Sequence, residues 1–195
     1  NAIPGSLIHN LQPCPDKAFS NKRVLMLGSL KRYKGTTVFV RLAETLSDYM
    51  FELVLNETQE NIDTYWRVNK LPLLANLTVY PRQQDVAPFY NRASIVLNLT
   101  DKNYAIETFG LTALEAMSVG LPVIVPTVGG IAEMVKDGEN GYKIDIQDFR
   151  KIVTKINHIL SEKALYDKMS KGALATASMY NEVHMCAQIE SILRE

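Results

Sequence analysis

The stretch that most constrains the fold runs from Glu107 to Gly130 and contains a loop, a helix and a strand in that order. Residues 111–118 carry apolar and small side chains at helical spacing, and Gly120 is the kind of residue that commonly ends a helix. Residues 123–125 are an unbroken apolar run, typical of a strand that is buried on both faces. This order predicts one crossover of a parallel α/β sheet.

Two carboxylates, Glu107 and Glu115, lie on either side of the start of this helix. The unpaired N–H groups of Phe109, Gly110 and Leu111 gather partial positive charge there, which suits an anion. An ionised carboxylate nearby accepts hydrogen bonds from hydroxyl groups. The stretch therefore predicts a site for a ligand that is both anionic and hydroxylated, and a nucleotide-sugar fits that description.

The residues alone leave other roles open for both carboxylates. Glu107 precedes the helix, where an acid gains about 0.3–1 kcal/mol from the helix dipole. Glu115 follows Thr112 by three residues, the spacing of a capping box, in which the carboxylate accepts from a backbone N–H. Glu133, three residues after a glycine pair, fits the first turn of a short helix.

Elsewhere in the chain, short apolar runs alternate with helical patterns. Strands are predicted at residues 24–27, 51–55, 77–80, 95–97 and 142–144, and helices near 36–46, 59–71, 85–93 and 129–134 and from 148 onward. Thr36 or Thr37 is the expected cap of the first helix, and Val183, Ile189 and Leu193 mark a last one. We expect a Rossmann-like, three-layer α/β/α domain over residues 22–195, preceded by a proline-containing linker or entry segment at 1–21.

Composition excludes several classes of function. Of 195 residues, 47% are hydrophobic, enough for one well-buried core, and no stretch is long and apolar enough to suggest a membrane span. Twenty-one basic and 21 acidic residues cancel, which argues against a nucleic-acid partner. Cys14 and Cys186 have no zinc or disulfide spacing, so we interpret them as inert thiols of a reducing compartment.

The loop after the first strand, Gly28 to Gly35, has no G-x-G-x-x-G pattern and carries cations in place of the glycines. Lys31, Arg32 and Lys34 are suited to neutralise a diphosphate. For Lys31 and Arg32 a solvated basic turn is the competing interpretation.

The motif stretch resembles a known family. Its Glu-x7-Glu pattern around Phe-Gly-Leu, followed by Glu-Ala-Met-x-x-Gly-x-Pro-Val-Ile and Gly-Gly-x-x-Glu, is similar to the C-terminal donor-binding domain of retaining group 1 glycosyltransferases with the GT-B fold. The similarity extends from about Lys22 to the end of the chain. It implies that this chain is one half of a GT-B enzyme, with an N-terminal acceptor-binding domain missing, and that the isolated domain is inactive.

The resemblance also implies roles for particular residues. Glu107 and Lys34 would act at the donor sugar and its leaving phosphate, Glu115 would hold the ribose, and the Phe109–Leu111 amides would assist the phosphates. Basic residues of the first loop would reach the diphosphate, although Ser29 stands where the family has arginine, so that Arg32 or Lys31 would have to compensate. The turn that contains Arg82 would meet the nucleotide base.

The same resemblance implies a hexosyltransferase-like reaction with retention. A departing nucleoside diphosphate must be stabilised by a metal, a cation or a dipole. No Asp-x-Asp motif occurs, so we expect no metal and no cofactor, with Lys34 supplying the charge. His9, His158 and His184 match no motif, and none is assigned as a catalytic base.

Two other functions remain open. The chain would be a non-catalytic nucleotide-sugar-binding or interaction module if its loops have diverged, or a GT-B-like epimerase that acts on the nucleotide-sugar itself. A cytoplasmic location is expected, with peripheral association at the inner face of the membrane through the missing half left open.

Overall fold

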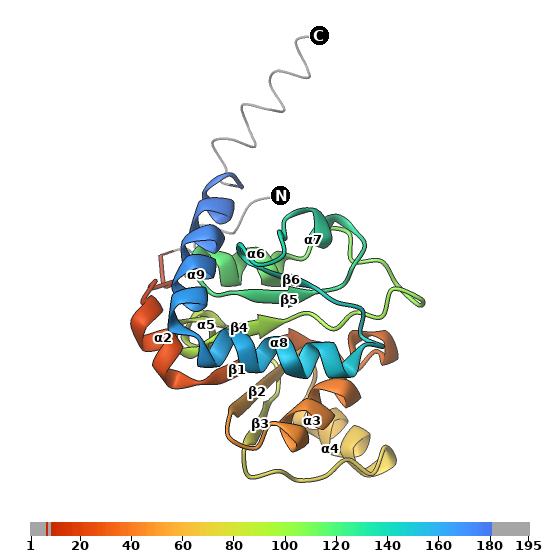
Figure 1. Ribbon diagram of the computed structural model, residues 1–195. Coiled ribbons are helices and arrows are strands. Elements are labelled where there is room, and N and C mark those ends of the chain that lie inside the picture. Colours follow the sequence, from red (N-terminus) through yellow and green to blue (C-terminus); the bar gives the residue numbers. More distant parts are fainter. Residues whose placement is uncertain (1–6, 8, 181–195) are drawn as a thin grey trace.

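The computed structural model describes residue 7 and residues 9–180, and at its centre lies a six-stranded parallel sheet (Figure 1). The strands lie in the order β3-β2-β1-β4-β5-β6. They are β1 (Arg23–Gly28), β2 (Met50–Leu55), β3 (Leu77–Tyr80), β4 (Ile95–Leu97), β5 (Val123–Val125) and β6 (Gly141–Lys143). The predicted Rossmann-like α/β fold with a parallel sheet is thereby confirmed.

Helices connect the strands and cover both faces of the sheet. They are α2 (Pro15–Asn21), the 3₁₀-helix η1 (Arg32–Lys34), α3 (Thr36–Thr45), α4 (Gln59–Val68), α5 (Ala87–Arg92), α6 (Leu111–Ser118), α7 (Gly130–Glu133), α8 (Phe149–Ser161) and α9 (Lys163–Ser178). The chain builds outward from β1 to β3 and then returns to start again at β4. Because such crossovers are right-handed, this reversal places α3 and α4 on one face and α5 and α6 on the other. Helix α8 returns to pack on α3, and α9 packs on α6.

Burial on both faces explains why the inner strands could be located in the sequence. Every residue of β4 and β5 is buried, as are residues 24–26 in β1. Strands that are covered on both faces consist of continuous apolar residues rather than of alternating polar and apolar ones, and turn residues mark the ends of each run. Strands β3, β4 and β5 have the predicted bounds, and β1, β2 and β6 differ from them by one residue at one or both ends. Among the helices of the described residues, none combines the length and the apolar character needed to cross a bilayer.

The segment expected to be a linker or entry segment contains a helix at its end, which the sequence did not predict. Helix α2 begins with Pro15 in its first turn, where proline lacks only an N–H that would have no helical partner. Ala18 is buried, and the helix packs against α5 and α9. Residues 15–21 therefore belong to the packed domain, and the prolines mark the start of a helix.

The start of α3 differs from the prediction. Neither Thr36 nor Thr37 caps α3, because the cap is Gly35, which has a φ of 77°. The Thr36 hydroxyl donates a hydrogen bond to the carbonyl oxygen of Ser29 at 3.5 Å instead. The predicted last helix, with its marker residues and with Cys186 and His184, lies outside the described residues.

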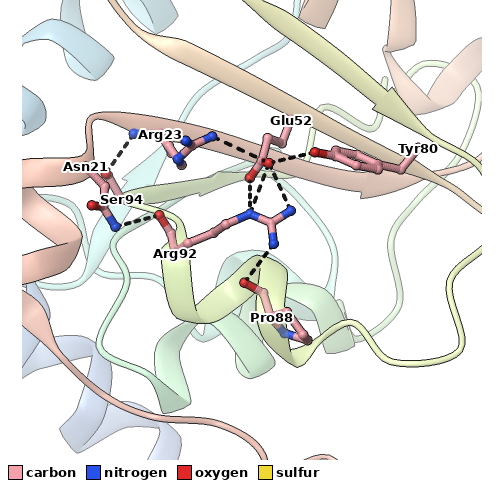
Figure 2. A network of polar contacts seen from close by, with 7 residues as sticks. All are labelled: Asn21, Arg23, Glu52, Tyr80, Pro88, Arg92 and Ser94. Atoms are coloured by element: carbon pink, nitrogen blue, oxygen red, sulfur yellow. Dashed lines mark hydrogen bonds and ion pairs between the residues drawn. The ribbon is translucent and has the colours of Figure 1, made fainter.

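A buried ionic network crosses the sheet at the end remote from the candidate site. The Glu52 side chain on β2 is 3% exposed and accepts hydrogen bonds from Arg92 of α5 through both oxygens, each at 3.0 Å (Figure 2). Arg23 of β1 approaches the same carboxylate at 3.5 Å, and the Tyr80 hydroxyl of β3 donates to it at 3.2 Å. The network links three adjacent strands to a helix, so we assign it a structural role.

Candidate functional site

A hollow of about 450 Å³ lies at the carboxyl ends of β1 and β4. These two strands are neighbours at the point where the strand order reverses, and this is where open α/β sheets bind ligands. The loops that follow the two strands leave the sheet at the same edge (Figure 1), and the Asp101 amide of one donates to the Tyr33 carbonyl of the other at 2.8 Å. The hollow is lined by Met26, Leu27, Gly28, Lys34, Asn56, Asn98, Leu99, Glu107, Thr108, Phe109, Gly110, Leu111 and Thr112.

Lys34 enters the hollow from the end of η1. Gly35 follows it in the left-handed conformation, and a side chain at Gly35 would overlap the Leu99 carbonyl oxygen. Glycine therefore lets this loop lie directly against the loop after β4. The Lys34 Nζ is 2.7 Å from Oε2 of Glu107, and the two side chains are 27% and 21% exposed. The structure thus brings together two predicted site residues that are 73 positions apart.

Glu107 is held from a second side by the loop that follows β4. The Thr100 hydroxyl lies 3.4 Å from Oε2 of Glu107 and also donates to Oδ1 of Asn98 at 2.8 Å. The carboxylate has a cation and a hydroxyl as neighbours, so it is fixed in place rather than free in solvent. The sequence placed Glu107 and Lys34 at the same site but did not predict that they form an ion pair with each other.

The start of α6 forms one wall of the hollow. Its cap is Gly110, with a φ of 78°, and a side chain there would overlap Ile131 of α7. Within the described residues, the amide N–H groups of Phe109, Gly110 and Leu111 donate to no protein acceptor. These three predicted donors face an open hollow beside a lysine, an arrangement that suits an anionic ligand.

Glu115 lies one turn beyond Thr112 on α6 and contacts α5. The Tyr90 hydroxyl donates to its Oε2 at 2.6 Å. Burial raises the pKa of Glu115 above its ordinary value, and the hydrogen bond from Tyr90 partly opposes that shift. The capping-box alternative is wrong, because Thr112 is inside the helix and the cap has no side-chain hydrogen bond.

The remaining predicted residues lie around the hollow rather than in its lining. The Ser29 carbonyl accepts from Thr36, and the Arg32 guanidinium lies over the Tyr104 ring, beside a separate hollow of about 320 Å³. The Arg82 Nε donates to Oδ1 of Asn56 at 2.6 Å. Arg82 also lines a hollow of about 200 Å³ that shares Asn56 with the main one.

Sequence reasoning missed three polar residues of this region. Asn98 and Thr100 follow β4, and Tyr90 comes from α5. A usable signal existed for the first two, because polar residues directly after a buried strand mark the carboxyl edge of a sheet. Tyr90 gave no such signal, since its contact with Glu115 spans 25 residues.

Known proteins resemble this chain in sequence and in fold. A family model described as glycosyl transferases group 1 matches residues 15–175. The D-inositol 3-phosphate glycosyltransferase of Acidothermus cellulolyticus is 30% identical over 184 residues, which cover 87% of this chain. The chain spans less than half of the length of that relative, 39%.

Two solved structures have the same fold. HepE from Anabaena, crystallised with UDP and glucose, has a TM-score of 0.81 and 20% identity, covering 100% of this chain and 55% of that one. The C-terminal domain of the group 1 glycosyltransferase LpcC from Francisella tularensis has a TM-score of 0.72 and 21% identity, covering 90% and 98%. The chain therefore belongs to the group 1 glycosyltransferases, and its parallel sheet is the Rossmann-like fold of GT-B glycosyltransferases.

Proposed function

We propose that this chain binds the nucleotide-diphospho-sugar donor of a retaining, metal-independent glycosyltransferase. The observation that carries the proposal is the Lys34–Glu107 pair, 2.7 Å apart, beside the free amides at the start of α6. A cation and three unpaired N–H groups on one wall suit a diphosphate. The adjoining carboxylate suits the hydroxyls of a sugar.

The nucleotide is oriented by residues at the two ends of the hollow. The diphosphate lies between Lys34 and the amides of residues 109–111, and Glu107 accepts hydrogen bonds from the donor sugar. Glu115, one turn along α6, receives the ribose hydroxyls. Arg82 lies on the side of β1 toward β2, where the base extends, and is already fixed by Asn56.

Lys34 then has a role in the reaction as well as in binding. When the bond between the sugar and the β-phosphate breaks, negative charge develops on the departing phosphate oxygen. Lys34 and the α6 amides stabilise that charge without reorganisation, because Gly35 and Gly110 already fix their backbones. Glu107 lies on the sugar side of the same site. If the acceptor displaces the phosphate directly, retention has the acceptor attack from the face that the phosphate leaves.

Arg32 has a different place in the proposal from the one that the sequence suggested. Its guanidinium lies over Tyr104, at a separate hollow, so it reaches the diphosphate only if it leaves that ring. Lys34 is therefore the main phosphate cation of the loop. Ser29 adds only a backbone carbonyl that is already bonded to Thr36.

The acceptor is held by an N-terminal half that is not part of this chain, and we propose a cytoplasmic location for the assembled enzyme. The chain spans 39% of the Acidothermus relative, which leaves room for a second domain in a protein of that length. UDP is the first nucleotide to test, because HepE was crystallised with it.

Calorimetric titration of the chain with UDP, GDP and ADP tests the proposal. We expect one of these nucleotides to bind more tightly than its nucleoside. Glu115→Gln should weaken the binding of that nucleotide and of its nucleoside. A chain that binds none of the three would contradict the proposed function. A non-catalytic binding module would also bind the nucleotide. The two functions are distinguished by assaying sugar transfer with the N-terminal half added: transfer supports the glycosyltransferase, and no transfer supports the binding module.

A further inference from the structure

Tyr90 is a fully buried tyrosine whose hydroxyl reaches the edge of the candidate site. Its exposure is 0%, and its OH lies 2.6 Å from Oε2 of Glu115 and 3.4 Å from the carbonyl oxygen of Thr112. A hydroxyl has one proton to donate, and the shorter contact goes to the charged acceptor. Tyr90 belongs to α5 and Glu115 to α6, so the contact joins two successive crossover helices.

This contact uses one carboxylate oxygen and leaves the other free. Within the described residues, Oε1 of Glu115 accepts no hydrogen bond, and Glu115 forms no ion pair. Thr112 is one turn earlier on the same helix face and lines the hollow. A carboxylate that is clamped through Oε2 therefore has one unoccupied oxygen close to the wall of the hollow.

The clamp has an electrostatic consequence. Burial disfavours the ionised form of Glu115 and raises its pKa, while the Tyr90 hydroxyl donates to the ionised form and lowers it. Tyr90 on α5 is the titratable neighbour that acts on this carboxyl, and no cation of the described residues pairs with it. The pKa of Tyr90 is in turn raised well above its usual value, by burial and by Glu115, so its proton stays available to donate.

We propose that Tyr90 is a positioning residue for nucleotide binding: its hydroxyl fixes Oε2 of Glu115 so that Oε1 is presented to the ribose hydroxyls. The inference rests on the proposed function, in which Glu115 binds the ribose. Tyr90 itself does not touch the nucleotide. It acts through Glu115, by restricting the rotamer of that side chain and by favouring its ionised form.

A purely structural role for Tyr90 makes different predictions, and the chain offers a matched control. Tyr166 is also fully buried, and its hydroxyl donates to the carbonyl oxygen of Ser94 at 2.9 Å. Ser94 precedes β4, at the opposite end of the sheet from the hollow. Tyr90→Phe and Tyr166→Phe each remove one buried hydroxyl and keep the ring. Both variants should lose stability, Tyr90→Phe the more because its hydroxyl donates to a carboxylate.

Titration calorimetry with UDP and with 2′,3′-dideoxy-UDP separates the two roles. We expect Tyr90→Phe to weaken UDP about tenfold at pH 7, which corresponds to about 1.4 kcal/mol. It should leave 2′,3′-dideoxy-UDP unchanged, because that nucleotide has no ribose hydroxyls for Glu115. Tyr166→Phe should change neither affinity. Equal loss for both nucleotides, or unchanged UDP affinity in Tyr90→Phe, would overturn the proposal.

A second measurement needs no ligand. The side-chain carboxyl carbon of Glu115, followed by NMR against pH, should titrate at a higher pH in Tyr90→Phe than in the wild type, and at the wild-type pH in Tyr166→Phe. An unchanged titration in Tyr90→Phe would also overturn the proposal. If Glu115→Gln leaves UDP binding unchanged, the proposed ribose role fails; if it weakens binding and Tyr90→Phe does not, only the positioning role of Tyr90 fails.

Discussion

Replacing Lys34 with alanine tests the phosphate site most sharply. If Lys34 contacts the diphosphate, Lys34→Ala removes one charge-assisted contact, about 1.5–3 kcal/mol, so a nucleoside diphosphate should bind roughly ten- to a hundredfold more weakly. The structure places the effect toward the larger value. Glu107 lies 2.7 Å from Nζ, and without the lysine its charge would face the phosphates uncompensated. The bare nucleoside, which carries no phosphate, should bind almost as before.

The same pair predicts the opposite response when Glu107 is changed. Glu107→Gln releases Lys34 from its ion pair with Glu107, so UDP should bind more tightly to this variant than to the wild type. A UDP-sugar should gain less affinity than UDP, because its sugar loses the contact with the Glu107 carboxylate. Stability should change by less than about 1 kcal/mol in either variant, because both side chains are partly exposed.

Calorimetry of uridine, UDP and a UDP-sugar against the two variants measures these effects. Lys31→Ala is the control, since Lys31 is an exposed cation of the same loop that does not line the hollow. The reasoning is refuted if Lys34→Ala weakens uridine and UDP equally, which would mean that Lys34 shapes the loop without touching phosphate. A Lys31→Ala loss as large as that of Lys34→Ala would refute it too, because long-range charge would then explain both.

Three further outcomes are expected. Ser29→Arg should tighten UDP binding in a calorimetric titration, with the gain eroded by added salt because part of it is screened attraction; no gain at low salt would contradict the expectation. The folded-state pKa of Glu115 is raised, so the stability that this group contributes is present at low pH and is lost as pH rises through that pKa. In denaturant unfolding at pH 7, Glu115→Gln should therefore be at least as stable as the wild type, and its free energy of unfolding should vary less with pH. A large loss of stability in Glu115→Gln would contradict this. Arg92→Ala should lower the free energy of unfolding by about 2–3 kcal/mol, because it leaves the buried Glu52 with Arg23 as its one cation among the described residues and with the Tyr80 hydroxyl. The loss should exceed that of Arg23→Ala, and UDP affinity should not change. Equal losses of stability in the two variants would show that the closer arginine does not dominate.

The sequence predicted the strands better than the polar contacts, for a physical reason. Strands β4 and β5 were placed correctly because burial on both faces requires uninterrupted apolar runs. Strand β3 lies at the edge of the sheet and is only partly buried, and its residues Leu77–Tyr80 were identified from their β-branched and aromatic side chains. Helix α2 was missed because Pro15 was interpreted as a breaker, although proline is well suited to the first turn of a helix. Whether that segment packs depends on α5 and α9, which are far away in the sequence.

At the candidate site, the sequence indicated which residues reach the carboxyl edge but not how they pair. Lys34 and Glu107 follow adjacent strands, so their meeting was implied by topology, while their ion pair depends on the close approach of the loops at Gly35. Arg32 is two residues before Lys34 in a 3₁₀ turn, where positions two apart point about 120° away from each other around the axis. The two cations of one motif therefore face different hollows, a divergence that composition cannot predict.

A crystal structure of the chain with UDP bound is the most direct test of the central claim. The account predicts the diphosphate within about 2.7–3.2 Å of Lys34 Nζ and of at least one amide among residues 109–111, with the ribose hydroxyls on Glu115. A diphosphate bound instead at the separate hollow beside Arg32 and Tyr104, with Lys34 still paired to Glu107 and free of phosphate, would contradict it.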